Sequence, residues 1–134
     1  MYTCKHFKIE ELVSKAVFRR YGQNAWWFFD PRILMVEDRL RGRFGPAVVN
    51  DWLWGGKFQH RGLRTPIDIE APAGDFSFHR LGMALDSHYL KRSVQEVRKY
   101  IIDNPDEYPE IKGLELDVNW LHKDVRNASR LITF

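Results

Sequence analysis

Residues 77–88 read Ser77-Phe78-His79-Arg80-Leu81-Gly82-Met83-Ala84-Leu85-Asp86-Ser87-His88. We interpret the second part of this stretch, from Leu81 to His88, as a β-strand. Gly82 and Ala84 are small residues at alternating positions, and small side chains let a ligand or another backbone segment approach closely. Because His79 and Asp86 flank these small residues, the stretch predicts a strand with a polar site beside it.

A second polar segment follows downstream, at Asn119-Trp120-Leu121-His122-Lys123-Asp124. It also has the character of a strand. Two histidines and one aspartate (His79, Asp86 and His122) can supply three ligands to a catalytic zinc ion, with water in the fourth position. The zinc would lower the pKa of that water toward ~7 and polarise a carbonyl group. On the residues alone, the alternative is that each is an ordinary structural or surface side chain.

The patterns around these two segments predict a mixture of helices and strands. Helices are predicted at residues 8–20, at residues 31–43 after an Asp30-Pro31 start, and from a Ser93-x-x-Glu96 capping box to Ile102. Strands are predicted at residues 47–52, 81–88, 114–117, 119–125 and 131–134. Residues 55–76, rich in Gly, Pro and Asp, are predicted to form a long loop of the kind that is usually functional or disordered.

This order of elements predicts the fold class. Helices, a strand, a loop, a strand, a helix and final strands indicate a small α+β fold with an antiparallel sheet and helices packed on one side. At 134 residues the chain is long enough to bury a core of its own. We therefore expect a single domain over residues 1–134.

Composition excludes several classes of protein. Cys4 is the only cysteine, which excludes an internal disulfide framework and every multi-cysteine zinc site. The net charge of +3 is mild, and no basic run is interleaved with aromatic residues, so we expect no nucleic-acid partner. No apolar stretch approaches membrane-spanning length, so we expect no membrane partner. Residues 1–11 are charged where a signal peptide is apolar, which argues against classical secretion.

The two polar segments together carry a family resemblance. The pattern Ser77-x-His79-x-x-Gly82-x-Ala84-x-Asp86, followed by Trp120-x-His122, resembles the zinc D-alanyl-D-alanine carboxypeptidase and L-alanyl-D-glutamate endopeptidase family. It is most similar to the short phage-encoded branch of these peptidases, and residues 7–12 also look like the opening of that branch. The likeness covers roughly residues 6–127, with the middle loop matching least. It implies a fold like that of the hedgehog and D-Ala-D-Ala peptidase domains.

The resemblance also implies roles for individual residues. It makes His79, Asp86 and His122 the ligands of Zn²⁺, and it assigns Ser77 to substrate binding. It further implies an upstream arginine that clamps or polarises the substrate. Arg64 matches best and Arg61 is the near alternative, and a guanidinium suits this task because its fork binds a carbonyl or carboxylate with directed hydrogen bonds. The alternatives are a surface ion pair for Arg64 and a plain turn residue for Ser77.

One position departs from the family pattern. Many members carry an acidic general base three residues before the last ligand, where this chain has Asn119. Asp124 follows His122 by two residues and shares its face on a regular strand, so it can act as the base or as a partner that orients His122. His88 is a further candidate by the same reasoning. Asp117 would lie on the opposite face unless a bulge intervenes.

The leading hypothesis is therefore a zinc metallopeptidase that hydrolyses peptidoglycan stem peptides, with Arg64 and Asp124 as catalytic residues. The expected setting is bacteriophage cell-wall degradation, either by an endolysin released from the host cytoplasm or by a virion component that contacts other virion proteins. The alternative is a virion structural or cell-wall-binding module that keeps the peptidase fold with impaired catalysis. We consider it because Asn119 stands where the family pattern has an acidic general base.

Overall fold

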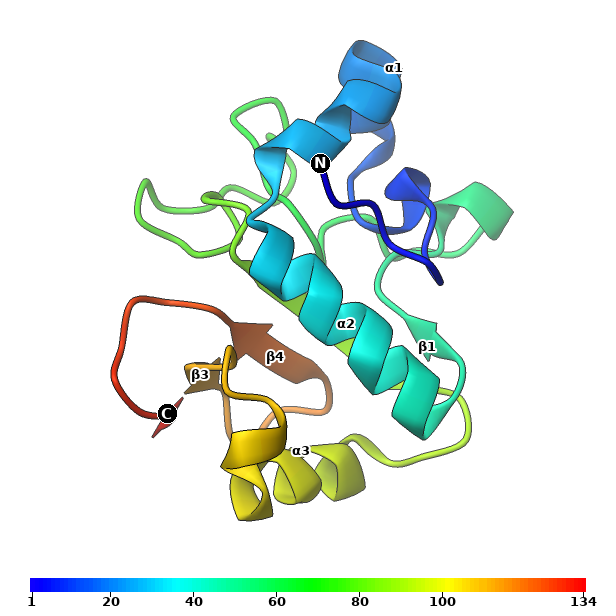
Figure 1. Cartoon of the computed structure of the whole chain (residues 1–134). Coiled ribbons are helices and arrows are strands. Elements are labelled where there is room, and N and C mark those ends of the chain that lie inside the picture. The colour runs from blue at the N-terminus through cyan, green and yellow to red at the C-terminus, as the bar shows by residue number, and fades with distance from the viewer.

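Two antiparallel strands, β2 (Ala84–Tyr89) and β4 (Leu121–Asp124), form the centre of the sheet in the computed structural model, which describes all residues 1–134 (Figure 1). Strand β1 (Ala47–Val48) pairs with β2, and β3 (Gly113–Leu114) pairs with β4, both antiparallel. The fifth strand, β5 (Ile132–Thr133), lies on the outer edge of β3. The protein is thus a small α+β domain with an open five-stranded sheet, in the order β1-β2-β4-β3-β5.

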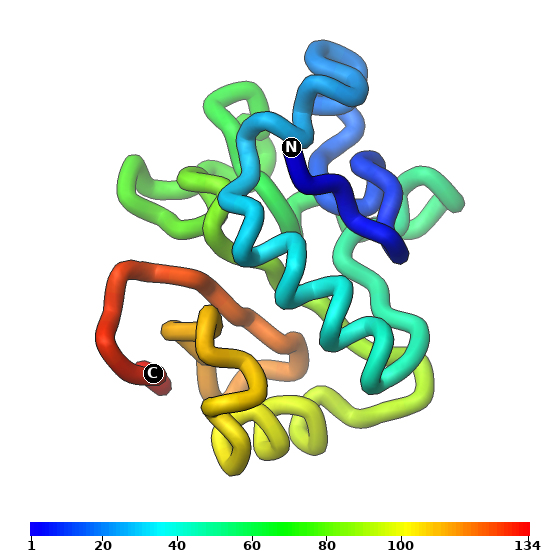
Figure 2. Tube along the Cα trace, viewed as in Figure 1, coloured from blue at the N-terminus to red at the C-terminus, as the bar shows by residue number.

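The expectation of a wholly antiparallel sheet is wrong at one edge, because β3 and β5 are parallel. The reason is topological. Strand β4 runs antiparallel to β3, and the chain reverses once more after β4 before it reaches the far side of β3. It therefore runs in the same direction as β3 when it pairs there, as the red C-terminal segment in Figure 2 shows.

Two of the three helices begin at the predicted caps. Asp30 accepts a hydrogen bond from the Arg32 amide at the start of α2 (Pro31–Phe44), and the capping box of Ser93 and Glu96 starts α3 (Val94–Asp103). Both match the predicted helices to within one residue. None of the helices is both long and apolar enough to cross a membrane.

The predicted helix over residues 8–20 is wrong as one continuous element. It is divided into a 3₁₀ turn (Ile9–Glu11) and helix α1 (Lys15–Tyr21), and Ser14 caps α1 by accepting a hydrogen bond from the Val17 amide. The carbonyl of Val13 instead accepts hydrogen bonds from the side chains of Asn50 and Trp52. Partners distant in the chain therefore outweigh the local helical pattern at this point.

All the predicted strands are shorter in the structure: the two central ones are reduced to Ala84–Tyr89 and Leu121–Asp124, and the other three pair over two residues each. The first, residues 47–52, pairs only at Ala47–Val48, because Asn50 turns away and its amide donates to the Glu11 carbonyl. The strand predicted at residues 114–117 ends at Leu114, before the left-handed backbone of Asp117 (φ 58°). The third, predicted at residues 131–134, pairs only at Ile132–Thr133. The loop over residues 55–76 is confirmed, since no helix or strand lies within it.

Helices α2 and α3 pack against the same face of the sheet, as predicted. Leu85 and Tyr89 of β2 pack with apolar residues of α2, and Leu121 of β4 packs with Val97 and Ile101 of α3. In Figure 1, α2 lies in front of β2 and runs along it, and α3 lies at the bottom of the view, below β4. The opposite face of β2 and β4 is left for the polar side chains of Asp86, His122 and Asp124, because side chains alternate between the two faces of a strand.

A buried ion pair lies on the helix-covered face, directly behind those polar residues. The Lys123 ammonium is 2.5 Å from the Glu37 carboxylate of α2 and donates a hydrogen bond of 2.7 Å to the Ser87 hydroxyl. Lys123 and Glu37 are fully buried. An ion pair removed from water depends on both partners, since either one alone is an uncompensated charge in the core.

We expect Lys123→Met to lower the free energy of unfolding by about 3–5 kcal/mol, because it leaves the Glu37 charge buried without a partner. The double variant Lys123→Met/Glu37→Leu should recover most of this loss, to within about 2 kcal/mol of the wild type. Urea unfolding in the presence of a chelator measures both values. A double variant as unstable as the single one would contradict this explanation.

Candidate metal centre

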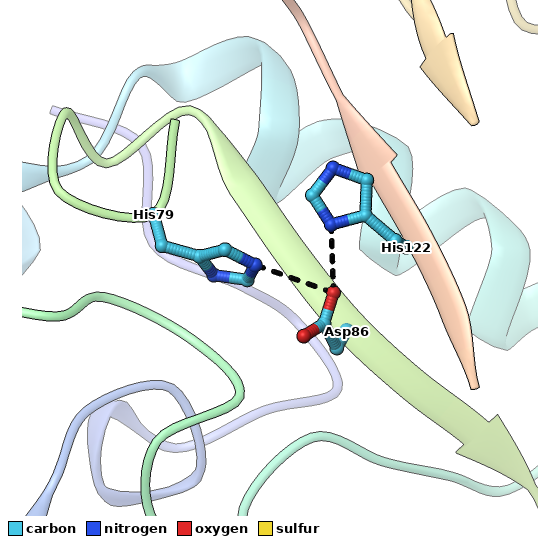
Figure 3. A group of neighbouring side chains, drawn as sticks. All are labelled: His79, Asp86 and His122. Carbon is cyan, nitrogen blue, oxygen red and sulfur yellow. Dashed lines mark hydrogen bonds and ion pairs between the residues drawn. The ribbon is translucent and has the colours of Figure 1, made fainter. Parts of the chain in front are cut away.

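Three side chains from separate parts of the chain meet on the face of the central strands that lies opposite the helices. His79, Asp86 and His122 each offer one ligand atom, and these three atoms lie within 4.8 Å of one another. The Asp86 carboxylate is 2.8 Å from His122 Nδ1 and 3.3 Å from His79 Nε2, so it stands between the two rings (Figure 3). All three residues are buried. The set can hold a metal ion.

The register of the sheet positions two of the three. Asp86 and His122 face each other directly across β2 and β4. Directly opposed residues of an antiparallel pair have their Cβ atoms about 4.5–5.5 Å apart, which brings the carboxylate and the imidazole into contact. His79 reaches the same point from the turn that precedes β2.

The backbone of the long loop fixes the ring of His79. Its Nδ1 donates a hydrogen bond of 2.8 Å to the Gly62 carbonyl. A carbonyl can only accept, so Nδ1 carries a proton and Nε2 is the nitrogen that faces Asp86. Such a hydrogen bond from the far nitrogen of a histidine is the usual support of a metal ligand.

The backbone of the turn before β2 explains why the pattern over residues 77–86 has a glycine at position 82. The φ of Gly82 is +68°, and a β-carbon at this position would collide with the carbonyl oxygen of Phe28. Its own carbonyl accepts a hydrogen bond from the Asp30 amide at the start of α2. A glycine is therefore required for the turn that carries His79 to pack against the segment leading into α2.

His122 is held from both sides. Its Nδ1 faces Asp86, and its Nε2 is 3.1 Å from the Asp124 carboxylate. Arg126 grips that carboxylate with two hydrogen bonds, from Nε (2.7 Å) and Nη2 (2.6 Å). The side chain of Asp124 fits because Gly113, its partner on β3, has no side chain to occupy the same space.

These contacts favour the orienting role of Asp124 over the role of general base. Both carboxylate oxygens already accept hydrogen bonds from Arg126, and Oδ2 also contacts the nitrogen of His122 that faces away from Asp86. Burial opposes the charge of Asp124, but the hydrogen bonds from Arg126 and His122 outweigh it and hold the pKa of this carboxyl below its usual value. A carboxylate with a lowered pKa is a weak proton acceptor.

The same network shifts the pKa values of Asp86 and His122 in opposite directions. Burial opposes both charges. The hydrogen bonds of Asp86 with His122 and His79 outweigh it and hold the pKa of Asp86 well below its ordinary value. The hydrogen bonds of His122 with Asp124 and Asp86 likewise raise the pKa of His122 to about 9. Without a metal, His122 therefore holds a proton at neutral pH, and a metal ion must displace it to use Nδ1.

The donor set suits zinc. Two imidazole nitrogens and one carboxylate oxygen form a three-ligand arrangement that is found in catalytic zinc sites. Each histidine has the partner that such ligands usually have, a backbone carbonyl for His79 and a carboxylate for His122. Both the three ligand atoms and the hydrogen-bond partners of the two histidines therefore fit a divalent metal such as zinc.

The structure separates the two candidate arginines. The Arg64 guanidinium lies 4.0 Å from the Asp86 carboxylate, and its Nε donates to the His60 carbonyl at 2.6 Å. Arg61 instead contacts His88 and does not reach the Asp86 side chain. Ser77 lies in a turn, where its amide donates to the Gly74 carbonyl, and no hydrogen bond joins its hydroxyl to the three ligands.

The remaining candidate residues lie apart from the ligands. Asn119 and Asp117 are exposed in the bend before β4. Sequence reasoning missed Arg126, although its spacing of two from Asp124 places both on one side of an extended segment. It also missed Phe134, whose ring packs edge-on to His122 with the centroids 5.8 Å apart. No local signal marks a contact between residues so far apart in the chain.

Comparisons with models of protein families, with curated proteins and with solved structures found no match to this chain.

We expect the wild-type protein to bind about one zinc ion per chain, and His122→Ala to weaken binding by at least about 100-fold, because a ligand contributes more than its supporting contacts. His6→Ala is the matched control, since His6 is exposed and outside the group. Isothermal titration and metal analysis measure both affinity and stoichiometry. A His122→Ala protein with wild-type zinc content would refute the site.

The stability of the metal-free protein should fall as the pH rises from about 7 to above 9. The folded pKa of His122 is raised to about 9 from an ordinary 6.5, so its stabilising contribution is complete below 6.5 and is lost as the pH passes 9. The expected loss is on the order of 2–3 kcal/mol. Urea unfolding with a chelator tests this, and His122→Gln should remove the slope. Equal slopes for both proteins would contradict the assignment.

Proposed function

We propose that this protein is a zinc metallopeptidase that hydrolyses peptidoglycan stem peptides. The observation that carries the proposal is the convergence of His79, Asp86 and His122 on one point, although 36 residues separate Asp86 from His122. These are the three residues that the likeness to the D-alanyl-D-alanine and L-alanyl-D-glutamate peptidases assigns to zinc. The contact between Arg64 and Asp86 also supports it, since that likeness expects an arginine beside the ligands.

Each part of the site has a chemical task in this proposal. A bound zinc ion would supply a water of lowered pKa and a Lewis acid for the scissile carbonyl. The Arg64 guanidinium, held by the His60 carbonyl, donates hydrogen bonds to the substrate beside the ligands. Asp124 and Arg126 hold His122 at Nε2, so that Nδ1 would be the nitrogen that coordinates once a metal displaces its proton. Hydrolysis adds hydroxyl to the acyl carbon and a proton to the leaving amine.

The proposed setting is the degradation of bacterial cell wall by a bacteriophage, either as an endolysin or as a virion-associated lysin. What supports it is the similarity of the sequence pattern to the short phage-encoded peptidases. In this setting the partner is the peptidoglycan stem peptide, and a virion-associated form also contacts other virion proteins.

A second candidate function is a cell-wall-binding or virion structural module that has lost most of its catalysis. Two observations favour it. Asn119 stands where related peptidases carry an acidic base, and an amide cannot accept and return a proton. The Asp124 carboxylate, the nearest replacement, is fully engaged by His122 and Arg126.

Digestion of purified peptidoglycan by the zinc-loaded protein tests the proposal. We expect the wild type to release new amino termini, and His79→Ala to lower the rate by at least about 1,000-fold, because it removes a metal ligand. Arg64→Met should lower kcat/KM by roughly 100-fold through loss of a charged hydrogen-bond donor. His6→Ala should act like the wild type. Full zinc occupancy with no hydrolysis of any stem peptide would reject the peptidase and favour the binding module.

A further inference from the structure

A second cation lies beside the metal centre and forms no salt bridge. Arg61 is half-buried, and its guanidinium stacks on the ring of Phe58, with 4.3 Å from Cζ to the ring centroid. Its only side-chain hydrogen bond joins Nη1 to His88 Nδ1 at 2.8 Å. No ion pair links it to a carboxylate, in contrast to Arg32, Arg39 and Arg126, which each grip one.

The hydrogen bond to Arg61 defines the state of His88. A guanidinium can only donate, so Nδ1 of His88 accepts and the ring carries its proton on Nε2. No protein acceptor is hydrogen-bonded to that Nε2, or to Nε and Nη2 of Arg61. The pair therefore presents several N–H donors and no acceptor, which is the composition of a site for an anion.

The pair is built onto the same strand as the metal ligands. His88 follows Asp86 by two residues on β2, which places both on one face about 6–7 Å apart. The carbonyl of Arg61 accepts a hydrogen bond of 2.8 Å from the Asp86 amide, and the Arg61 amide donates to Asn50 Oδ1 at 3.0 Å. Backbone contacts and the Phe58 ring thus fix Arg61 next to the centre but separate from Arg64.

We propose that Arg61 and His88 form a subsite that binds a free carboxylate of the substrate, one or two residues from the scissile bond. This inference rests on the proposed peptidase function and specifies its substrate. The spacing follows from the chain, since one residue of an extended peptide spans at most about 3.3–3.6 Å. Arg64 serves the scissile group, and Arg61 recognises the charge beyond it.

Two positions in a stem peptide supply such a carboxylate. One is the α-carboxylate of a C-terminal D-alanine, next to the bond that a carboxypeptidase cuts. The other is the α-carboxylate of a γ-linked D-glutamate, next to the bond that an L-alanyl-D-glutamate endopeptidase cuts. The chemistry of the ligand is the same, so matched peptides are needed to distinguish these two sources.

The test compares two pairs of peptides, each as the free carboxylate and as the carboxamide. The first pair is L-Lys-D-Ala-D-Ala and its C-terminal amide, and the second is L-Ala-γ-D-Glu-L-Lys and the same peptide with D-isoglutamine. Hydrolysis by the zinc-loaded protein gives kcat and KM, and an NMR titration of the metal-free protein gives binding without turnover. The variants are Arg61→Gln and Arg61→Lys, with the exposed Arg130→Gln as the matched control.

We expect the wild type to prefer the carboxylate in one pair by about 10- to 100-fold in kcat/KM, mainly through KM, as a charge-assisted hydrogen bond provides. Arg61→Gln should reduce this preference to less than about threefold, Arg61→Lys should retain part of it, and Arg130→Gln should retain all of it. The pair that shows the preference identifies the source of the carboxylate.

Failure of the subsite and failure of the peptidase give different results. Hydrolysis with a preference that persists in Arg61→Gln would overturn the subsite and leave the peptidase intact. Absence of hydrolysis, together with Arg61-dependent binding of a carboxylate over its amide, would support the subsite and reject the peptidase. Equal binding of acid and amide by the wild type, in both pairs, would overturn the subsite.

Discussion

The antiparallel register of β2 and β4 is the constraint on which the site depends, because it places Asp86 directly opposite His122. A slip of one residue would turn every side chain of one strand to the other face and separate the two ligands. The same register aligns Lys123 with Glu37 and Ser87 on the helix-covered face. The polar contacts on both faces of β2 and β4 therefore require the same strand register. A change of register would break the contacts on both faces together.

The carboxylate of Asp86 is buried at a point where its charge must be balanced. Two imidazoles contact it and the Arg64 guanidinium stands nearby. Asp124 lies between His122 and Arg126, so positive and negative groups also alternate farther from Asp86. Arg61 is the exception in this neighbourhood, since it has a neutral histidine as its partner.

The sequence predicts the local features well where a single residue determines them. Asp30, Ser93 and Glu96 predict two helix starts, because a cap is a contact between near neighbours. Residues 77–88 predict the central strand, and the resemblance of the sequence pattern to zinc peptidases predicts the group of His79, Asp86 and His122 that the structure brings together. What the sequence cannot show is the effect of distant or unforeseen partners. The Asn50 and Trp52 side chains donate to the Val13 carbonyl, and Arg126 donates to the Asp124 carboxylate. The separation of Arg61 from Arg64 likewise follows only from the folded loop.

The most direct test of the metal centre is a crystal structure of the protein grown with zinc, using anomalous scattering at the zinc absorption edge. A site as described here predicts one strong anomalous peak between His79, Asp86 and His122, at roughly 2.0–2.2 Å from one nitrogen of each histidine and one oxygen of the aspartate. A zinc ion bound elsewhere, with the three side chains still in contact with one another, would show that they do not form the metal site.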